Sequence, residues 1–504
     1  MKLHWLSIGL LAALSQDAGA FQVKRETTTP RDKLQYGVHY FDQKINHFPD
    51  DELFSQSNLS YGTFKQRYYF DSSYYKPGGP VYFIGGVILE NRYYGASYPF
   101  KTSTTDELLF LTTNQTIADN AHFAQNAVFP GVNGSLTAPN TPWIVYGGSL
   151  AGAQTAASIK VYGDILYGGI ASSAPIKVNV GYPEWYNPIQ KYAPQDCVAR
   201  INKIVDNFDL LVAKNHTKAI KQFKAFFGLE SLTDHRDFAA AIADPIGNPG
   251  FYHLNTWQEL NWNSSYGSRD FFYFCGNVSD IDAPEEHTQV DYILANYTNG
   301  EPWTGLGNYA NYVKRHTLPL CSSGDYNSNE CWGTQNATAW ASIENSSSRS
   351  YLYTSCIEQG AYISAPKEGP SLLSRVVDTD YEQQWCRWAF PPGKYNTVPD
   401  TPDVDAYNDF GAFNFTADRL AFIDGDQDVW NDLCYHSNFA PARTSTDLHP
   451  ELLITGAGHH WDSYGILNVE AEPQFIREAH KWEVKTVKKW LRDFDQWKVS
   501  KKLG

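Results

Sequence analysis

The stretch that most constrains the fold is Pro142–Gly152, which reads PWIVYGGSLAG. Its apolar start, Trp143–Tyr146, predicts a short buried strand. Two glycines, Ser149 and a run of small residues follow, which is the layout of a nucleophile elbow, a tight strand-to-helix turn that exposes a serine hydroxyl. The usual pattern is G-x-S-x-G, but Ala151 stands at the last glycine position and Gly152 follows it. The alternative reading is a Gly-Ser loop in any α/β protein.

Residues 1–20 have the pattern of a secretory signal peptide. Lys2 is followed by the mostly apolar run Leu3–Leu14 and an A-x-A site at Ala18–Ala20, so cleavage before Phe21 is predicted. No later run reaches the roughly 18 apolar residues of a membrane-spanning helix. The C-terminal residues also lack the hydrophobic tail that would predict a lipid anchor. The sequence therefore predicts a protein with no membrane partner, located outside the cell or in a vacuolar or lysosomal lumen.

Asparagine sequons support the secretory route, because N-x-S/T is the acceptor motif for glycosylation. The chain has ten, and glycosylation is predicted at each: Asn58, Asn114, Asn133, Asn215, Asn263, Asn277, Asn296, Asn336, Asn345 and Asn414.

The number of cysteines also indicates a protein of the secretory route. Seven cysteines in an oxidising environment predict that most of them pair and that one is left over. Cys321–Cys331 and Cys356–Cys386 are the predicted pairs. None of the seven has C-x-x-C spacing, which argues against a zinc site, and we expect no metal and no cofactor.

Length and charge narrow the class further. A chain of 504 residues fits two domains, or one large domain with an insertion. The net charge of −15 and the absence of a basic patch argue against a nucleic-acid partner. The oligomeric state is not predicted.

The apolar pattern along the mature chain predicts an α/β core that is interrupted by a helical cap. Residues 21–178 contain strand-like runs and form the first part of the core, and residues 346–504 return to this pattern and form the second part. Between them, residues 179–345 carry apolar side chains at helical spacing and form the cap. The predicted strands lie near residues 40–48, 63–70, 81–84, 87–90, 143–146, 168–175, 419–423 and 452–455.

The junction at Gly85-Gly86 conflicts with a fully parallel sheet. Two apolar runs separated by two glycines are typical of a β-hairpin, whereas parallel neighbours need a crossover of a dozen or more residues. Either these two strands are antiparallel, or a crossover is missing.

A serine hydroxyl needs a base to take its proton, and the base needs a carboxylate to orient it. In α/β-hydrolases these groups follow in the order Ser, Asp, His. Ser149 is followed by an acidic loop after residue 423 and by a histidine pair after residue 455, in that order. The pattern leaves His459 and His460 unresolved, and it leaves four acids open: Asp424, Asp426, Asp428 and Asp432. A calcium loop is an alternative reading of the first three acids.

The reaction also needs two N–H donors for the developing oxyanion. The backbone N–H of Leu150 is one candidate, because it follows the nucleophile. The second is expected from the loop after strand 81–84, at Gly85 or Gly86.

These motifs together resemble the serine peptidase family of lysosomal Pro-X carboxypeptidase, dipeptidyl-peptidase II and fungal acid prolyl endopeptidases. The resemblance covers nearly the whole mature chain, and it includes YF…HF from Tyr40, TF…QRY from Thr63, ENRYYG from Glu90, GGS at Gly147, ASSAP at Ala171, GDQDVW at Gly425 and GHH at Gly458.

The resemblance implies an α/β-hydrolase fold with an inserted helical domain and cleavage of peptide bonds beside proline. It places the triad acid at Asp428 and the base at His459. It also places Trp430 in an apolar proline pocket, with Trp461 nearby; core packing is the less favoured alternative for Trp430. Peptides or proteins that contain proline are the implied substrates. Whether cleavage is internal or terminal stays open.

The chain departs from the family pattern at several places. Leu150 stands where many members have Tyr, Val429 replaces Pro, and no Arg follows the histidine pair, which puts carboxypeptidase action in doubt. The family's crossover between Gly86 and Val87 is absent. Two alternatives therefore stand beside the peptidase: a carboxylesterase or lipase that uses the same triad, and a catalytically impaired glycoprotein on a hydrolase scaffold.

Overall fold

The computed structural model describes residues 36–503, except 74, 77, 78, 84, 85, 248–255, 264, 266, 268 and 322. The predicted signal peptide and its cleavage site lie outside these residues. One sheet of 8 strands, in the order β1-β2-β4-β3-β5-β6-β7-β8, forms the centre of the fold. The strands are β1 (His39–Lys44), β2 (Thr63–Phe70), β3 (Val81–Phe83), β4 (Val87–Leu89), β5 (Trp143–Gly148), β6 (Gly168–Ser172), β7 (Leu420–Gly425) and β8 (Glu451–Ile454).

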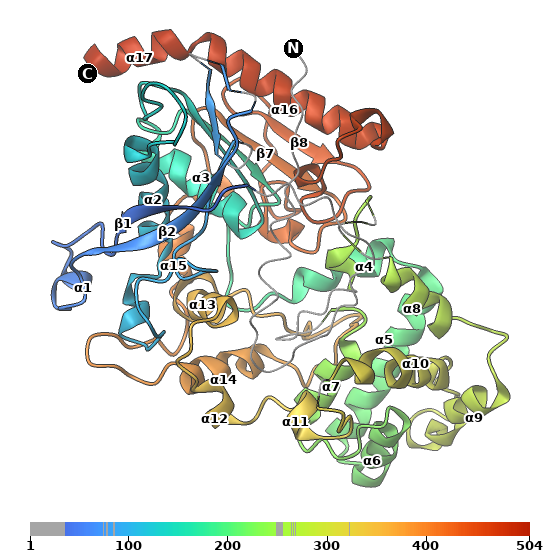
Figure 1. Cartoon of the computed structure of the whole chain (residues 1–504). Helices are drawn as coiled ribbons and strands as arrows, with labels where there is room; N and C mark the ends of the chain where they lie inside the picture. The colour runs from blue at the N-terminus through green and yellow to red at the C-terminus, as the bar shows by residue number, and fades with distance from the viewer. Residues whose placement is uncertain are drawn as a thin grey trace.

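The sheet is antiparallel at its start and parallel through the rest. β1 pairs antiparallel with β2, and β2 with β4, whereas β3, β5, β6, β7 and β8 all pair parallel with their neighbours. A mixed sheet with helices on its faces is the predicted α/β-hydrolase architecture (Figure 1).

The β3–β4 junction is parallel, so its reading as a hairpin is wrong. The two strands pair at one position only, Phe83 with Val87. Only residues 84–86 separate the two strands, which is too few for a crossover, yet β4 runs in the same direction as β3. β3 nevertheless keeps its full register with β5, from Val81 opposite Trp143 to Phe83 opposite Val145. The strand that leads to Ser149 is therefore supported on both sides.

Alternate residues of β5 explain how helices cover both faces of the sheet. Trp143 and Val145 belong to a buried apolar cluster with residues of the helices α2 and α3. Ile144 points to the opposite face, into a cluster with residues of α16. A strand that is buried on both faces reads as a continuous apolar run, which is the pattern that the sequence has here. The bounds are α2 (Thr113–Asn126), α3 (Leu150–Tyr162) and α16 (Gln474–Arg492).

A helical region separates β6 from β7 and lies beside the sheet domain in Figure 1. Its first part falls within the predicted cap and forms most of a buried apolar cluster, which also takes in residues such as Trp385 and Trp430 from later in the chain. The helices of this part are α4 (Asn187–Tyr192), α5 (Gln195–Ala213), α6 (Thr217–Phe226), α7 (His235–Ala243), α8 (Asp270–Val278), α9 (Glu285–Ile293), α10 (Leu306–Tyr312), α11 (Asn329–Trp332) and α12 (Ala337–Trp340).

After residue 345 the described chain stays helical until β7. Residues of α13 and α14 share an apolar cluster with the first core segment, including Phe110 and Tyr353. The boundary at 345 thus stays a prediction, and the strands of the second core segment begin only at Leu420. The remaining helices are α1 (Glu52–Ser55), α13 (Ser347–Thr354), α14 (Thr379–Ala389), α15 (Val404–Asn408) and α17 (Phe494–Leu503).

Three disulfides form, and Cys434 is the free, buried cysteine. The two predicted pairs, Cys321–Cys331 and Cys356–Cys386, are confirmed. The third, Cys197–Cys275, joins α5 to α8 across 78 residues.

Candidate active site

Ser149 sits in the turn between β5 and α3 with φ 58° and ψ −130°. A positive φ is uncommon for a residue with a Cβ, and it marks a strained turn. Glycines make the turn possible, because a Cβ on Gly147 would lie 2.1 Å from the Ala151 carbonyl oxygen, and one on Gly152 would lie 2.7 Å from that of Ser172. The close approach to the neighbouring strand therefore occurs at Gly152, which accounts for the displaced glycine of the motif.

Asp428 and His459 form a buried pair. His459 Nδ1 lies 2.9 Å from both carboxylate oxygens of Asp428, and the two residues are 6% and 1% exposed. The Trp430 backbone N–H also donates to Asp428, at 2.9 Å. When the carboxylate accepts the hydrogen of Nδ1, the free lone pair of the neutral imidazole lies on Nε2. Nε2 is then the nitrogen that can accept a proton as a base.

The other three acids of the loop have different partners. Asp424 contacts His436 Nδ1 at 2.7 Å. Asp426 accepts from the Gly456 backbone N–H, and Asp432 from the Asn438 side chain. Because these carboxylates turn to separate partners, they do not converge on one cation, and the described residues contain no group of three or more His, Cys, Asp or Glu that could hold a metal. The geometry thus singles out Asp428.

His460 occupies a different environment from His459. Its ring stacks on Tyr464 at 5.3 Å, and its backbone N–H donates to the Ser173 hydroxyl. Burial lowers the pKa of His460 well below its ordinary value, and the neighbouring His459 adds to this shift. A buried neutral ring without a carboxylate partner suits packing better than base catalysis.

The loop of His459 lies against the elbow of Ser149. A Cβ built on Gly148 would lie 3.2 Å from Cγ of His460, so the residues next to the nucleophile and next to the base are in contact. His459 Nε2 is buried and makes no hydrogen bond to any described residue, Ser149 included. The acid and base are thus brought together, whereas the hydrogen bond from serine to base is not formed here. Such contacts often tighten only when substrate binds.

The two predicted oxyanion donors, Leu150 and Gly86, differ in whether their backbone N–H already has an acceptor. Leu150 is the first residue of α3, and an N–H at this position has no acceptor within its helix. The Gly86 N–H donates to the Tyr82 carbonyl at 2.9 Å. In this conformation the Gly86 amide is therefore occupied, and its role as an oxyanion donor stays a prediction. Gly85 lies outside the described residues.

Trp430 and Trp461 both pack where the cap meets the core. Trp430 is 8% exposed and stacks on Tyr182 with ring centroids 5.5 Å apart. Its indole N–H donates to Gln258 Oε1 at 3.2 Å, and that of Trp461 donates to the Leu260 carbonyl at 2.7 Å.

The cap segment 256–262, which no sequence motif pointed to, contacts the loops of both Asp428 and His459. Besides accepting from Trp430 and Trp461, it donates indole N–H groups from Trp257 to the Gln427 carbonyl and from Trp262 to the Trp461 carbonyl. Two tryptophans five residues apart were the only available signal, and nothing in their spacing predicts these partners.

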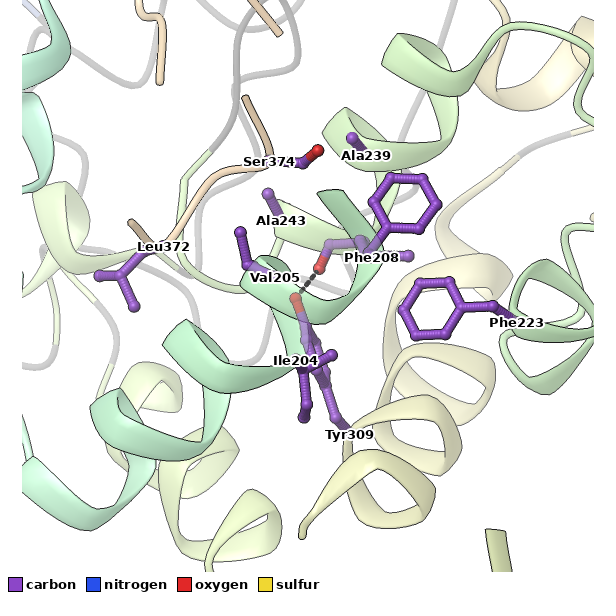
Figure 2. A pocket seen from close by; sticks show the side chains of 10 residues that line it. Ile204, Val205, Phe208, Phe223, Ala239, Ala243, Tyr309, Leu372 and Ser374 are labelled. Atoms are coloured by element: carbon purple, nitrogen blue, oxygen red, sulfur yellow. Dashed lines mark hydrogen bonds between the residues drawn. The ribbon is translucent and has the colours of Figure 1, made fainter. Parts of the chain in front are cut away.

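A small cavity lies inside the cap, away from these residues. Its volume is about 10 Å³, and Figure 2 shows Phe208, Phe223 and Tyr309 around it. The Tyr309 hydroxyl donates to the Ile242 carbonyl there. Space for one water at most cannot hold a peptide, so this cavity is a packing defect of the cap core.

The exposure of the ten sequons and the character of the helices are relevant to where the protein is located. All ten asparagine side chains are exposed or half-buried, which leaves them open to a glycan, and glycosylation stays a prediction. In the described part of the chain, no helix is both long enough and apolar enough to cross a membrane.

Comparison with known proteins places the chain. The family model described as serine carboxypeptidase S28 matches residues 85–479. The chain belongs to this family. It is therefore a serine-type peptidase, which the paired Asp428 and His459 and the elbow at Ser149 suit.

Relatives agree with this placement. A probable extracellular serine carboxypeptidase of Arthroderma benhamiae is 31% identical over 505 residues, which cover 91% of this chain and 68% of the relative. The serine protease vicPa of Bipolaris victoriae is 26% identical over 489 residues, 88% of each chain. The lysosomal Pro-X carboxypeptidase of Homo sapiens is 30% identical over 204 residues, 34% of this chain and 38% of the relative.

Proposed function

We propose that the chain cleaves peptide bonds after proline, with Ser149 as nucleophile, His459 as base and Asp428 as the group that orients the base. The pairing of Asp428 with His459 Nδ1 carries this proposal, because it leaves Nε2, which is buried and has no hydrogen-bond partner among the described residues, as the proton acceptor. The names of the relatives support a location outside the cell or in a vacuolar or lysosomal lumen.

The mechanism follows from the positions of these groups. Ser149 Oγ attacks the carbonyl carbon of the substrate while its proton passes to His459 Nε2, and Asp428 stabilises the imidazolium. The Leu150 N–H, at the start of α3, donates to the oxyanion, and the positive end of the helix favours the same charge. His459 then gives its proton to the departing amine, which leaves an acyl-enzyme. Water deprotonated by His459 releases the acid and restores the serine.

Proline preference is proposed from the aromatic wall at the cap. Tyr182 and Trp430 stack with an interplanar angle of 14°, and a flat aromatic face suits a pyrrolidine ring. Gln258 fixes the edge of Trp430 by its hydrogen bond. Trp461 lies in the loop of His459, and its indole N–H donates to the same cap segment that holds Trp430.

A peptide-library digest read by mass spectrometry tests this proposal, because it reports the residue before the cut and its distance from either end. We expect cleavage after proline and little hydrolysis of simple esters. Efficient ester hydrolysis with no proline preference would instead support the carboxylesterase alternative.

One observation favours the alternative of an impaired enzyme. The Gly86 amide is occupied by the Tyr82 carbonyl, so one of the two expected oxyanion donors is not available in this conformation. Loss of one donor typically slows acyl transfer about 10²–10³-fold. A folded protein that reacts with a phosphonate but turns over proline peptides about that much more slowly than a full-length relative would support it.

A further inference from the structure

Asp462 joins the loop of His459 to two strand ends. Its Oδ2 accepts a hydrogen bond from the Tyr146 hydroxyl on β5, and its Oδ1 accepts one from the Ser172 hydroxyl at the end of β6, both at 2.6 Å. The same two strands hold the nucleophile, because β5 leads into Ser149 and the Ser149 N–H donates to the Ser172 carbonyl at 2.9 Å. One carboxylate thus connects the loop of the base with the scaffold of the nucleophile.

On α16, His480 makes a second contact with Asp462, through a hydrogen bond to its backbone. His480 Nε2 lies 2.9 Å from the Asp462 carbonyl oxygen, and Nδ1 lies 3.1 Å from Glu472 Oε2. A carbonyl oxygen only accepts, so Nε2 bears a hydrogen. The contact of Nδ1 with Glu472 fixes the orientation of the ring. The backbone of Asp462 is therefore held by a histidine that a carboxylate orients.

Glu483 is the unusual member of this group. It is 0% exposed, and neither of its carboxyl oxygens has a hydrogen-bond partner among the described residues. Burial raises the pKa of Glu483 well above its ordinary value, and the charge of Asp462 adds to the shift. Burial also raises the pKa of Asp462, against the effect of its bonds from Ser172 and Tyr146. Ionising Glu483 would create a second negative charge in the same buried site.

We propose that Asp462 is a positioning residue that holds the His459 loop on the strands carrying Ser149, and that Glu483 makes this hold strongest in acid. The inference rests on the catalytic roles proposed for Ser149 and His459. Among the described residues, the titratable groups around Asp462 are Tyr146 from β5, His480 and Glu483 from α16, and Glu472, which precedes α16 and contacts His480.

The sign of the pH effect follows from Glu483. Its folded-state pKa is raised, so its contribution is fully present below the ordinary pKa of a glutamate and is lost as pH rises through the raised value. The loop is thus firmly held in an acidic compartment and loosens as the compartment becomes alkaline.

The test is the second-order rate constant for labelling by a fluorophosphonate, measured across pH on the full chain. This probe reports activation of the serine without requiring a proline pocket. Asp462→Asn should slow labelling about 10–100-fold at all pH values, the usual effect of removing a group that orients catalytic residues. Labelling should slow as pH rises, and Glu483→Gln should raise the pH at which the labelling rate is half lost by about one unit. This is the size of the coupling between two interacting carboxyls. Glu478→Gln, at an exposed site on the same helix, should change neither.

Tyr146→Phe is a second test in case Asp462→Asn does not fold, because it removes one hydroxyl that bonds to Asp462 and keeps the ring. Labelling per folded molecule should fall about fivefold, as expected for one hydrogen bond, whereas a merely structural role would lower the melting temperature and leave this rate unchanged. A reactive wild type with unaffected Asp462→Asn, Tyr146→Phe and Glu483→Gln variants would overturn the positioning role. An unreactive wild type would overturn the catalytic assignment itself.

Discussion

Replacing Asp428 by asparagine is the perturbation whose size the structure fixes best. Asp428 is 1% exposed, and both of its oxygens lie 2.9 Å from His459 Nδ1. The amide keeps the shape of the side chain but brings an N–H₂ group to the same site. It therefore favours the imidazole with its hydrogen on Nε2, which cannot take the proton of Ser149. This exchange typically lowers kcat about 10⁴-fold, which is about 5.5 kcal/mol of transition-state stabilisation.

The assay is hydrolysis of a proline peptide together with the rate of fluorophosphonate labelling, in wild type and variant. Asp426→Asn is the matched control, because Asp426 belongs to the same loop and accepts a backbone N–H from Gly456 instead of a histidine. We expect kcat to fall about 10⁴-fold for Asp428→Asn and less than about threefold for the control, with KM little changed. Equal losses in the two variants, or a large loss only for Asp426→Asn, would refute the assignment of the acid.

Three further predictions concern the pocket, the pH dependence and the cap. Trp430→Phe should lower kcat/KM for proline peptides about fivefold, through loss of one hydrogen bond, and leave phosphonate labelling unchanged. Burial raises the pKa of Glu382 to about 8, so its stabilising contribution is lost as pH rises through that value; urea unfolding at several pH values should show a flatter profile for Glu382→Gln. Replacing Cys197 and Cys275 by alanine opens a loop of 78 residues and should lower the free energy of unfolding in urea by about 4 kcal/mol.

The sheet was predictable because its strands carry local signals. The run at Trp143–Tyr146 is apolar throughout since β5 is buried on both faces, and the elbow that follows is marked by Gly147 and Gly152, where a Cβ would collide with backbone oxygens. The direction of β3 and β4 was not predictable. Two glycines between apolar runs suggest a hairpin, but pairing of Val87 with Phe70 of β2 sets the direction of β4 instead.

The candidate site was predictable as a set of motifs and not as a set of contacts. Four acids share one loop and the local pattern does not separate them; the family resemblance pointed to Asp428, and the structure shows that Asp428, and not Asp424, contacts His459. The Cys197–Cys275 pair was missed because partners 78 residues apart leave no spacing signal. The cap segment 256–262 was missed for the same reason, since its hydrogen bonds reach residues near 427 and 461.

The most direct measurement of the central claim is the site of covalent labelling by a fluorophosphonate, mapped by mass spectrometry of the digested protein. We predict that the phosphonate is found on Ser149, that labelling of folded Ser149→Ala is lost, and that His459→Ala reduces it strongly. Labelling at another serine, or full labelling of the folded Ser149→Ala variant, would contradict the account.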